Sequence, residues 1–156
     1  MKVTSNAFAD QESIPEKYTC DGDNIAPPLT LHDVPADIQS FALIMHDPDI
    51  PQEIRKSRGI EEFDHWVVYN IDPKTREIAE GVPVGTLGVN SRGDTGYTGP
   101  CPPKDLEPTT HRYIFTVYAL NTILDIAPQA DRATVEAKLK DHIITQATLT
   151  GVYDRS

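Results

Sequence analysis

The sequence predicts a mainly β sandwich with a peripheral helix. Three short segments carry this prediction, because each is rich in β-branched or aromatic residues and is bounded by Pro, Asp or Gly. These segments are residues 40–46, 65–72 and 112–120. The chain also contains 13 prolines, which favour rigid loops over a helical bundle.

The strand prediction is clearest in residues 112–120. Side chains there alternate between two sets, and both sets are largely apolar, as expected of a pleated strand buried on both faces. Another layer of structure should therefore cover each face. Residues 2–6 are expected to form an opening strand and residues 148–153 a closing strand.

One helix is predicted near the C-terminus. Asp131 can cap its first turn, Val135, Leu139 and Ile143 repeat on one face, and Gly151 ends the region. Two proline- and glycine-rich stretches, 48–64 and 73–110, are longer than usual hairpin loops, so function is expected at their ends.

Length and charge limit the classes of function. The 156 residues fit one domain, 1–156, and the net charge of −10 repels nucleic-acid phosphates and anionic membranes. No apolar run approaches the roughly 20 residues of a spanning helix, and the first residues lack an apolar signal core. We expect no nucleic-acid partner, no transmembrane segment and a cytoplasmic location.

The chain has two cysteines, Cys20 and Cys101. They are too few and too far apart for a zinc site with paired-ligand spacing, and a cytosolic setting would keep both thiols reduced. A single disulfide between them stays open as an alternative.

Titratable residues lie where the predicted strands begin and end. Asp47 and Asp49 follow the first strand, whereas His65 and His111 begin the next two. If these strands are antiparallel neighbours, two carboxylates and two imidazoles meet at one rim of the sheet. The pattern alone favours the simpler interpretation, in which the aspartates form turns around Pro48 and the histidines are solvated.

Residues 99–103 form a stiff segment. Three of the five are prolines, so its backbone offers two N–H donors, from Gly99 and Cys101. The segment could hold one wall of a pocket at little entropic cost, or it could be an ordinary rigid connection.

Six motifs in this order resemble the phosphatidylethanolamine-binding protein family, and more narrowly its bacterial and archaeal branch, often called Raf kinase inhibitor-like proteins. The resemblance covers about residues 5–153, and six ordered motifs are far more specific than any one. The motifs are Thr19-Cys20-Asp21-Gly22, Pro27-Pro28-Leu29, Asp47-Pro48-Asp49, His65-Trp66-Val67-Val68-Tyr69-Asn70, Gly99-Pro100-Cys101-Pro102-Pro103 and His111-Arg112-Tyr113.

The resemblance implies an antiparallel β-sandwich with one or two peripheral helices, a C-terminal helix included, and a small anion-binding cavity. Family members bind phosphate-bearing groups such as phosphorylethanolamine, and some inhibit kinases or proteases. We therefore expect a ligand-binding regulator with no catalytic residue, no metal and no cofactor. The implied ligand-binding residues are Asp47, Asp49, His65, Gly99, Pro100, Cys101, Pro102, Pro103, His111 and Tyr113.

A division of roles follows from the chemistry of these side chains. An imidazole that is protonated near neutral pH can donate to a phosphate oxygen, so His65 and His111 are the expected donors. Asp47 and Asp49 would repel phosphate, so we expect them to orient the imidazoles or to pair with a ligand ammonium group.

Three other functions stay open. A hydrolase could combine an Asp–His pair with Ser57, Ser91 or Thr98, although the sequence has no Gly-x-Ser-x-Gly elbow. A metal site near the same aspartates and histidines, His46 included, would lack the usual ligand spacing. The chain could also be a protein-interaction module with a vestigial cavity.

The sequence leaves open the natural ligand, the partner and the oligomeric state, a homodimer included. It also leaves open the role of residues 50–64 and 104–110.

Overall fold

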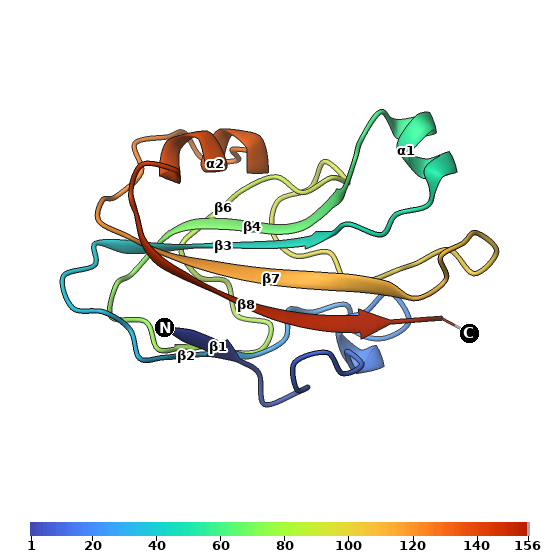
Figure 1. Ribbon diagram of the computed structural model, residues 1–156, viewed down its shortest axis with the longest axis horizontal. Coiled ribbons are helices and arrows are strands. Elements are labelled where there is room, and N and C mark those ends of the chain that lie inside the picture. The colour runs from blue at the N-terminus through green and yellow to red at the C-terminus, as the bar shows by residue number, and fades with distance from the viewer. Residues whose placement is uncertain (156) are drawn as a thin grey trace.

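The computed structural model describes residues 1–155, which fold into two antiparallel sheets (Figure 1). The larger sheet has the strand order β6-β4-β3-β7-β8, and the smaller has the order β1-β2-β5. The larger sheet comprises β3 (Ser40–Asp47), β4 (Phe63–Ile71), β6 (Thr86–Leu87), β7 (His111–Leu120) and β8 (Ile143–Tyr153). The smaller comprises β1 (Lys2–Thr4), β2 (Leu29–His32) and β5 (Glu77–Ile78). The helices are α1 (Gln52–Arg58), α2 (Arg132–Leu139) and a 3-10 turn (Glu16–Tyr18).

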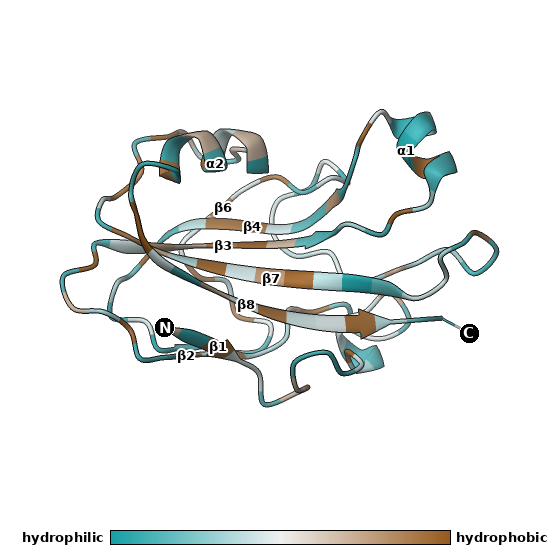
Figure 2. Cartoon of the chain, in the orientation of Figure 1, coloured by the Kyte–Doolittle hydropathy of each residue, from teal (hydrophilic) through white to brown (hydrophobic). Residues whose placement is uncertain are grey.

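Both faces of the large sheet are buried, as the alternation in residues 112–120 predicts. Phe41, Leu43 and Met45 on β3 join the core between the two sheets, whereas Ala42 and Ile44 join the apolar cluster beneath α2. The middles of the strands are accordingly hydrophobic, and their polar residues lie toward the ends (Figure 2). The mainly β fold class is confirmed.

The C-terminal helix is shorter than predicted. It begins after the Asp131 cap, whose carboxylate accepts from the Thr134 N–H, but it ends at Leu139. Ile143 pairs with Leu120 as the first residue of β8, so its predicted place on the helix face is wrong. Gly151 lies within β8, where a Cβ would come 2.4 Å from Ile14 Cγ1, so close packing accounts for this glycine.

Helix α1 falls within residues 48–64, which the sequence analysis described as a loop. None of its residues is buried, so it has no apolar stripe from which to predict it. It ends at Gly59, whose φ of 65° is the left-handed conformation typical of a helix C-terminus.

Strand β3 lies between β4 and β7 and is antiparallel to both. Asp47 at its end pairs with Phe63 at the start of β4, and His46 pairs with Ile114 near the start of β7. The predicted meeting of one strand end with two strand starts is confirmed.

Cys20 and Cys101 form a disulfide, with Cα atoms 5.4 Å apart. It joins the loop after the 3-10 turn to residues 99–103. Stable disulfides are less usual in a reducing cytosol, so this bond weighs against the cytoplasmic location, which stays a prediction.

Among the helices of residues 1–155, none has the length and apolar character needed to cross a bilayer.

Candidate functional site

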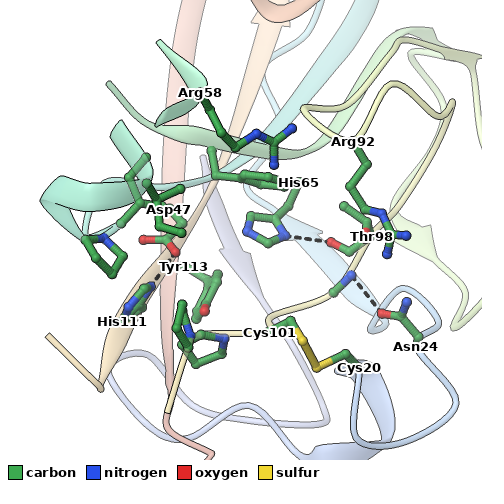
Figure 3. Close-up of a pocket in the computed structure, with 17 residues that line it drawn as sticks. Cys20, Asn24, Asp47, Arg58, His65, Arg92, Thr98, Cys101, His111 and Tyr113 are labelled. Carbon is green, nitrogen blue, oxygen red and sulfur yellow. Dashed lines mark hydrogen bonds and ion pairs between the residues drawn. A yellow bond between two sulfur atoms is a disulfide. The ribbon is translucent and has the colours of Figure 1, made fainter. Parts of the chain in front are cut away.

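A cavity of about 200 Å³ opens at the edge where β3 ends and β4 and β7 begin. Figure 3 shows side chains from these strands, from α1 and from two loops turned toward it. Its lining consists of Cys20, Asn24, Asp47, Ile50, Pro51, Ile54, Arg58, Phe63, His65, Arg92, Thr98, Gly99, Cys101, Pro102, Pro103, His111 and Tyr113.

Asp47 and His111 form a buried pair on one side of the cavity. His111 Nδ1 lies 2.6 Å from Asp47 Oδ2, and the two side chains are 1% and 4% exposed. His111 Nε2 lies 2.8 Å from the Pro108 carbonyl oxygen, so both ring nitrogens face acceptors, as in a protonated imidazole. Burial alone lowers the pKa of His111, but its hydrogen bond to the Asp47 carboxylate and the charge of that group outweigh burial and raise it.

This pairing corrects one predicted role. Both ring nitrogens of His111 face acceptors inside the protein, so its predicted role as a donor to a ligand is wrong. Asp47 does orient an imidazole. Its second oxygen accepts from the Asp49 N–H at 2.7 Å, so neither carboxylate oxygen lacks a donor.

His65 has a different electrostatic state. Its Nδ1 lies 2.7 Å from the Thr98 carbonyl oxygen, which can only accept, so Nδ1 carries a proton. The side chain is 5% exposed, and burial lowers its pKa to about 4. Burial therefore favours the neutral ring, in which Nε2 is an acceptor, and this disagrees with the predicted role of His65 as a protonated donor near neutral pH.

Tyr113 contributes the most unusual polar atom of the site. It lines the cavity, is 0% exposed, and its hydroxyl has no hydrogen-bond partner among residues 1–155. Burial raises the pKa of the phenol, so the hydroxyl keeps its proton. Its ring meets the His65 ring edge-on, with centroids 5.2 Å apart. The site therefore holds one buried donor that the protein itself does not use.

Two predicted residues do not line the cavity. Asp49 lies beside it, where its carboxylate accepts from the Arg112 guanidinium through two contacts of 2.9 Å and also from the Arg112 N–H. This pairing lowers the pKa of Asp49, and the carboxylate orients no imidazole. Pro100 is buried behind the lining, with its carbonyl accepting from the Cys20 N–H.

The stiff segment 99–103 forms one wall, as its composition allowed. Gly99 donates its N–H to Asn24 Oδ1 at 2.8 Å, and a Cβ on Gly99 would come 2.3 Å from the Tyr18 carbonyl oxygen. Glycine is therefore required there for close backbone approach. The Cys101 N–H has no acceptor among the described residues, so one of the segment's two donors is unused.

Sequence reasoning missed two arginines of the lining, Arg58 and Arg92. Arg58 ends α1 and lies over the Phe63 ring, with its guanidinium carbon 5.2 Å from the ring centroid. Arg92 belongs to the glycine-rich stretch, and the guanidinium Nε is 3.9 Å from Asp94 Oδ2. A basic last turn followed by Gly59 was the available signal for Arg58, whereas nothing local marks Arg92.

Apolar side chains complete the lining. Ile50, Pro51, Ile54 and Phe63 come from the β3–α1–β4 segment, and Pro102 and Pro103 come from the stiff segment. The cavity thus combines apolar walls with a few polar groups, an arrangement typical of small-molecule sites.

The structure offers little support for a metal site or for a hydrolase. No group of three or more His, Cys, Asp or Glu side chains within residues 1–155 could hold a metal ion. His46 lies on the α2 side of the sheet, near Glu62. Neither Ser57 nor Ser91 lines the cavity, and Thr98 meets His65 through its carbonyl oxygen.

Comparisons with known proteins agree with this architecture. Residues 4–154 match the family model described as phosphatidylethanolamine-binding protein. A UPF0098 protein of Chlamydia pneumoniae is 44% identical over 157 residues, covering 100% of both chains. A UPF0098 protein of Methanothermobacter thermautotrophicus is 41% identical over 162 residues, covering 99% of each.

Two solved structures are similar over nearly their whole length. The phosphatidylethanolamine-binding protein homologue CT736 of Chlamydia trachomatis has a TM-score of 0.91 and 37% identity, covering 99% of this chain and 97% of its own. Escherichia coli YbcL, described as a member of the mammalian PEBP family, has a TM-score of 0.85 and 30% identity, covering 99% and 98%.

Proposed function

The chain belongs to the phosphatidylethanolamine-binding protein family, and from this we propose that its cavity binds a small ligand carrying a phosphate or another anionic group. The observation that carries the proposal is the buried Tyr113 hydroxyl. A buried donor without a partner costs about 1–3 kcal/mol, and an acceptor oxygen of a ligand in the cavity would remove that cost.

Local charge favours an anion despite the net charge of −10. Arg58 and Arg92 line the cavity, and the charge of Asp47 is balanced by that of His111. A group bound between the arginines and Tyr113 therefore meets cationic donors first. Attraction by such a small cationic region acts over about a Debye length, so it is short-ranged and sensitive to salt.

The shape of the cavity suggests what accompanies the anionic group. About 200 Å³ holds a small ligand, and the walls around Ile54 and Pro102 are apolar. An organic substituent on the anion would bury apolar surface there, whereas inorganic phosphate would leave this wall unused.

We propose binding and regulation, without turnover. The Asp47–His111 pair is used internally, and neutral His65 contacts a backbone carbonyl oxygen instead of a hydroxyl nucleophile. Ligand binding would then regulate a partner protein, such as a kinase or protease, that docks beside the cavity. Helix α1 fits such a surface, since it has no buried residue and its last turn carries Arg55, Lys56 and Arg58.

Calorimetric titration with inorganic phosphate and phosphorylethanolamine tests this proposal. We expect phosphorylethanolamine to bind, and Arg58→Ala and Arg92→Ala each to weaken binding about fivefold, which corresponds to about 1 kcal/mol. Arg76→Ala is the matched control, because that exposed guanidinium donates to the Pro73 and Thr75 carbonyl oxygens away from the cavity. Absence of binding by both ligands, or equal effects of all three variants, would contradict the proposal.

A further inference from the structure

The disulfide forms part of the cavity wall. It joins Cys20 to Cys101, and both residues line the cavity (Figure 3). Cys101 is exposed and Cys20 is half-buried, so the bond lies within reach of a dithiol in solution. Exposed disulfides exchange with thiols more readily than enclosed ones, and they are the ones most often used for regulation. The bond is therefore placed to respond to the redox conditions around the protein.

Hydrogen bonds hold the part of the stiff segment that precedes Cys101. The Cys20 N–H donates to the Pro100 carbonyl oxygen at 3.1 Å, and the Gly99 N–H donates to Asn24 Oδ1 at 2.8 Å. Neither bond uses a sulfur atom, so both can persist when the disulfide is reduced. This part of the segment is therefore expected to keep its position in either redox state.

Beyond the disulfide the chain has fewer attachments. No hydrogen bond joins residues 102–107 to the rest of the described chain. The next fixed point is Pro108, whose carbonyl oxygen lies 2.8 Å from His111 Nε2. Between these points Pro102 is buried, Pro103 is half-buried, and both line the cavity. The disulfide therefore anchors one end of a span that supplies two residues of the lining.

We propose that the Cys20–Cys101 disulfide is a redox-controlled anchor of the ligand cavity, opened by a protein dithiol of the Cys-x-x-Cys type. This inference rests on the proposed function, since it concerns regulation of the same cavity. With the bond closed, the span 102–107 is held in its binding position. With the bond open, ligand binding must also order the span, and this entropic cost lowers the affinity.

The exchange transfers two electrons and two protons from the dithiol to the protein. A thiolate of the dithiol attacks the Cys101 sulfur, the bond between the cysteine sulfurs breaks, and Cys20 leaves as a thiolate that takes up a proton. The second thiol of the dithiol loses its proton and attacks the mixed disulfide. Cys101 then leaves as a thiolate and is protonated in turn. The protein ends with two thiols, and the dithiol ends as a disulfide.

The coupling between the ligand and the disulfide must be reciprocal. If the oxidised protein binds phosphorylethanolamine about tenfold more tightly than the reduced protein, saturating ligand makes the disulfide harder to reduce. A tenfold ratio corresponds to a shift of about 30 mV for a two-electron couple. A disulfide that stabilises the fold without acting on the cavity would show no such shift.

NMR relaxation of the unaltered protein, before and after reduction with dithiothreitol, tests the anchor without any ligand. We expect the bond to open while the protein stays folded. The backbone order parameters of Cys101 and Lys104 should then fall from about 0.85 to below about 0.6, with β3 and β7 unchanged. A bond that opens only when the whole protein unfolds, or order parameters that stay the same, would overturn the inference.

Calorimetric titration with phosphorylethanolamine measures the effect on the cavity. We expect the reduced protein to bind about tenfold more weakly than the oxidised protein. The Cys20→Ser/Cys101→Ser double variant is the control for the reductant, because it should bind as weakly as the reduced protein with or without dithiothreitol. Reduction of the unaltered protein gives the same comparison if the double variant does not fold.

The outcomes separate this inference from the proposed function. Equal affinity of the folded oxidised and reduced proteins would overturn the inference and leave the proposed function intact. Absence of binding by both forms would contradict the proposed function, and with it the inference. Weaker binding by the reduced protein, together with the matching shift in reduction potential, is the result that we expect.

Discussion

The large sheet carries a cluster of charged and polar side chains on each face, and neighbouring residues of the same strands supply both. His46 and Asp47 end β3, and Asp64 and His65 are the second and third residues of β4. His46 and Asp64 lie on the α2 side with Arg132, whereas Asp47 and His65 line the cavity. The two clusters therefore share a backbone and differ in what their polar atoms contact.

The α2 cluster consists of His46, Glu62, Asp64, Arg132 and Glu136, and most of its charged groups pair with one another. Arg132 donates to Glu62 at 2.9 Å, to Asp64 at 3.1 Å and to Glu136. Its one buried side-chain atom without a partner, His46 Nδ1, does not line the hollow beside Arg132. A buried atom without a partner that does not face a cavity gives no reason to expect a bound ligand.

The cavity cluster differs in this respect. The Tyr113 hydroxyl is buried without a hydrogen-bond partner among residues 1–155, and Tyr113 lines the cavity. The comparison teaches that clustered charge alone does not identify a binding site. Unused hydrogen-bonding groups that open onto a cavity do.

The largest effect is expected from breaking the Asp47–His111 pair. Asp47→Asn would leave the buried imidazolium without its carboxylate, and removing one partner of a buried ion pair costs about 3–5 kcal/mol. Urea denaturation measures this loss. Asp49→Asn, which removes a half-buried charge paired with exposed Arg112, should cost under about 1 kcal/mol. Equal losses in the two variants would contradict the account of the buried pair.

The two histidines of the cavity should impose opposite pH dependences on the free energy of unfolding. The pKa of His111 is raised above 6.5 in the fold, so its contribution is complete below pH 6.5 and is lost as the pH rises through the raised value. The pKa of His65 is lowered from 6.5 to about 4, so its contribution is complete above pH 6.5 and is lost as the pH falls toward 4. Each slope approaches about 1.4 kcal/mol per pH unit.

Urea denaturation of the unaltered protein and of two variants from pH 4 to 9 measures these slopes, as differences between the stability profiles. His111→Gln should remove the loss of stability above pH 6.5, and His65→Gln should reduce the loss below it. His46, whose pKa is also lowered by burial, stays in both variants and cancels in the comparison. Superimposable profiles for the two variants would show that the assigned protonation states are incorrect.

A smaller effect is expected in the α2 cluster. Arg132→Met removes the cation shared by three carboxylates, and because these groups are partly exposed we expect a loss of about 1–2 kcal/mol in stability. Affinity for phosphorylethanolamine should change less than about twofold, since Arg132 does not line the cavity. A clear loss of affinity at unchanged stability would place part of the site on the α2 face.

The sequence predicted the elements that have strong periodic patterns. The alternation in residues 112–120 identified β7 with both faces covered, and the family resemblance is confirmed together with the fold. Ile143 was misassigned because its spacing from Leu139 suits a helix, whereas pairing with Leu120 draws it into β8. Helix α1 was missed because it buries no residue.

The sequence predicted which residues form the site better than it predicted the role of each residue. Strand order explains why Asp47, His65 and His111 meet, and the antiparallel argument anticipated it. Whether an imidazole donates or accepts depends on which carbonyl oxygen lies beside it, and Thr98 and Pro108 reach the rings through loops whose paths no local pattern encodes. The same holds for Arg92, which arrives from the glycine-rich stretch.

The most direct test of the difference between the two clusters is calorimetric titration of Tyr113→Phe with phosphorylethanolamine, alongside its urea denaturation. Tyr118→Phe, on the opposite face of β7, is the matched control. We predict about tenfold weaker binding for Tyr113→Phe, with stability unchanged or raised by up to about 1 kcal/mol, because the variant deletes a buried donor that the protein does not use. Unchanged affinity, or a loss of affinity matched by Tyr118→Phe, would contradict the account.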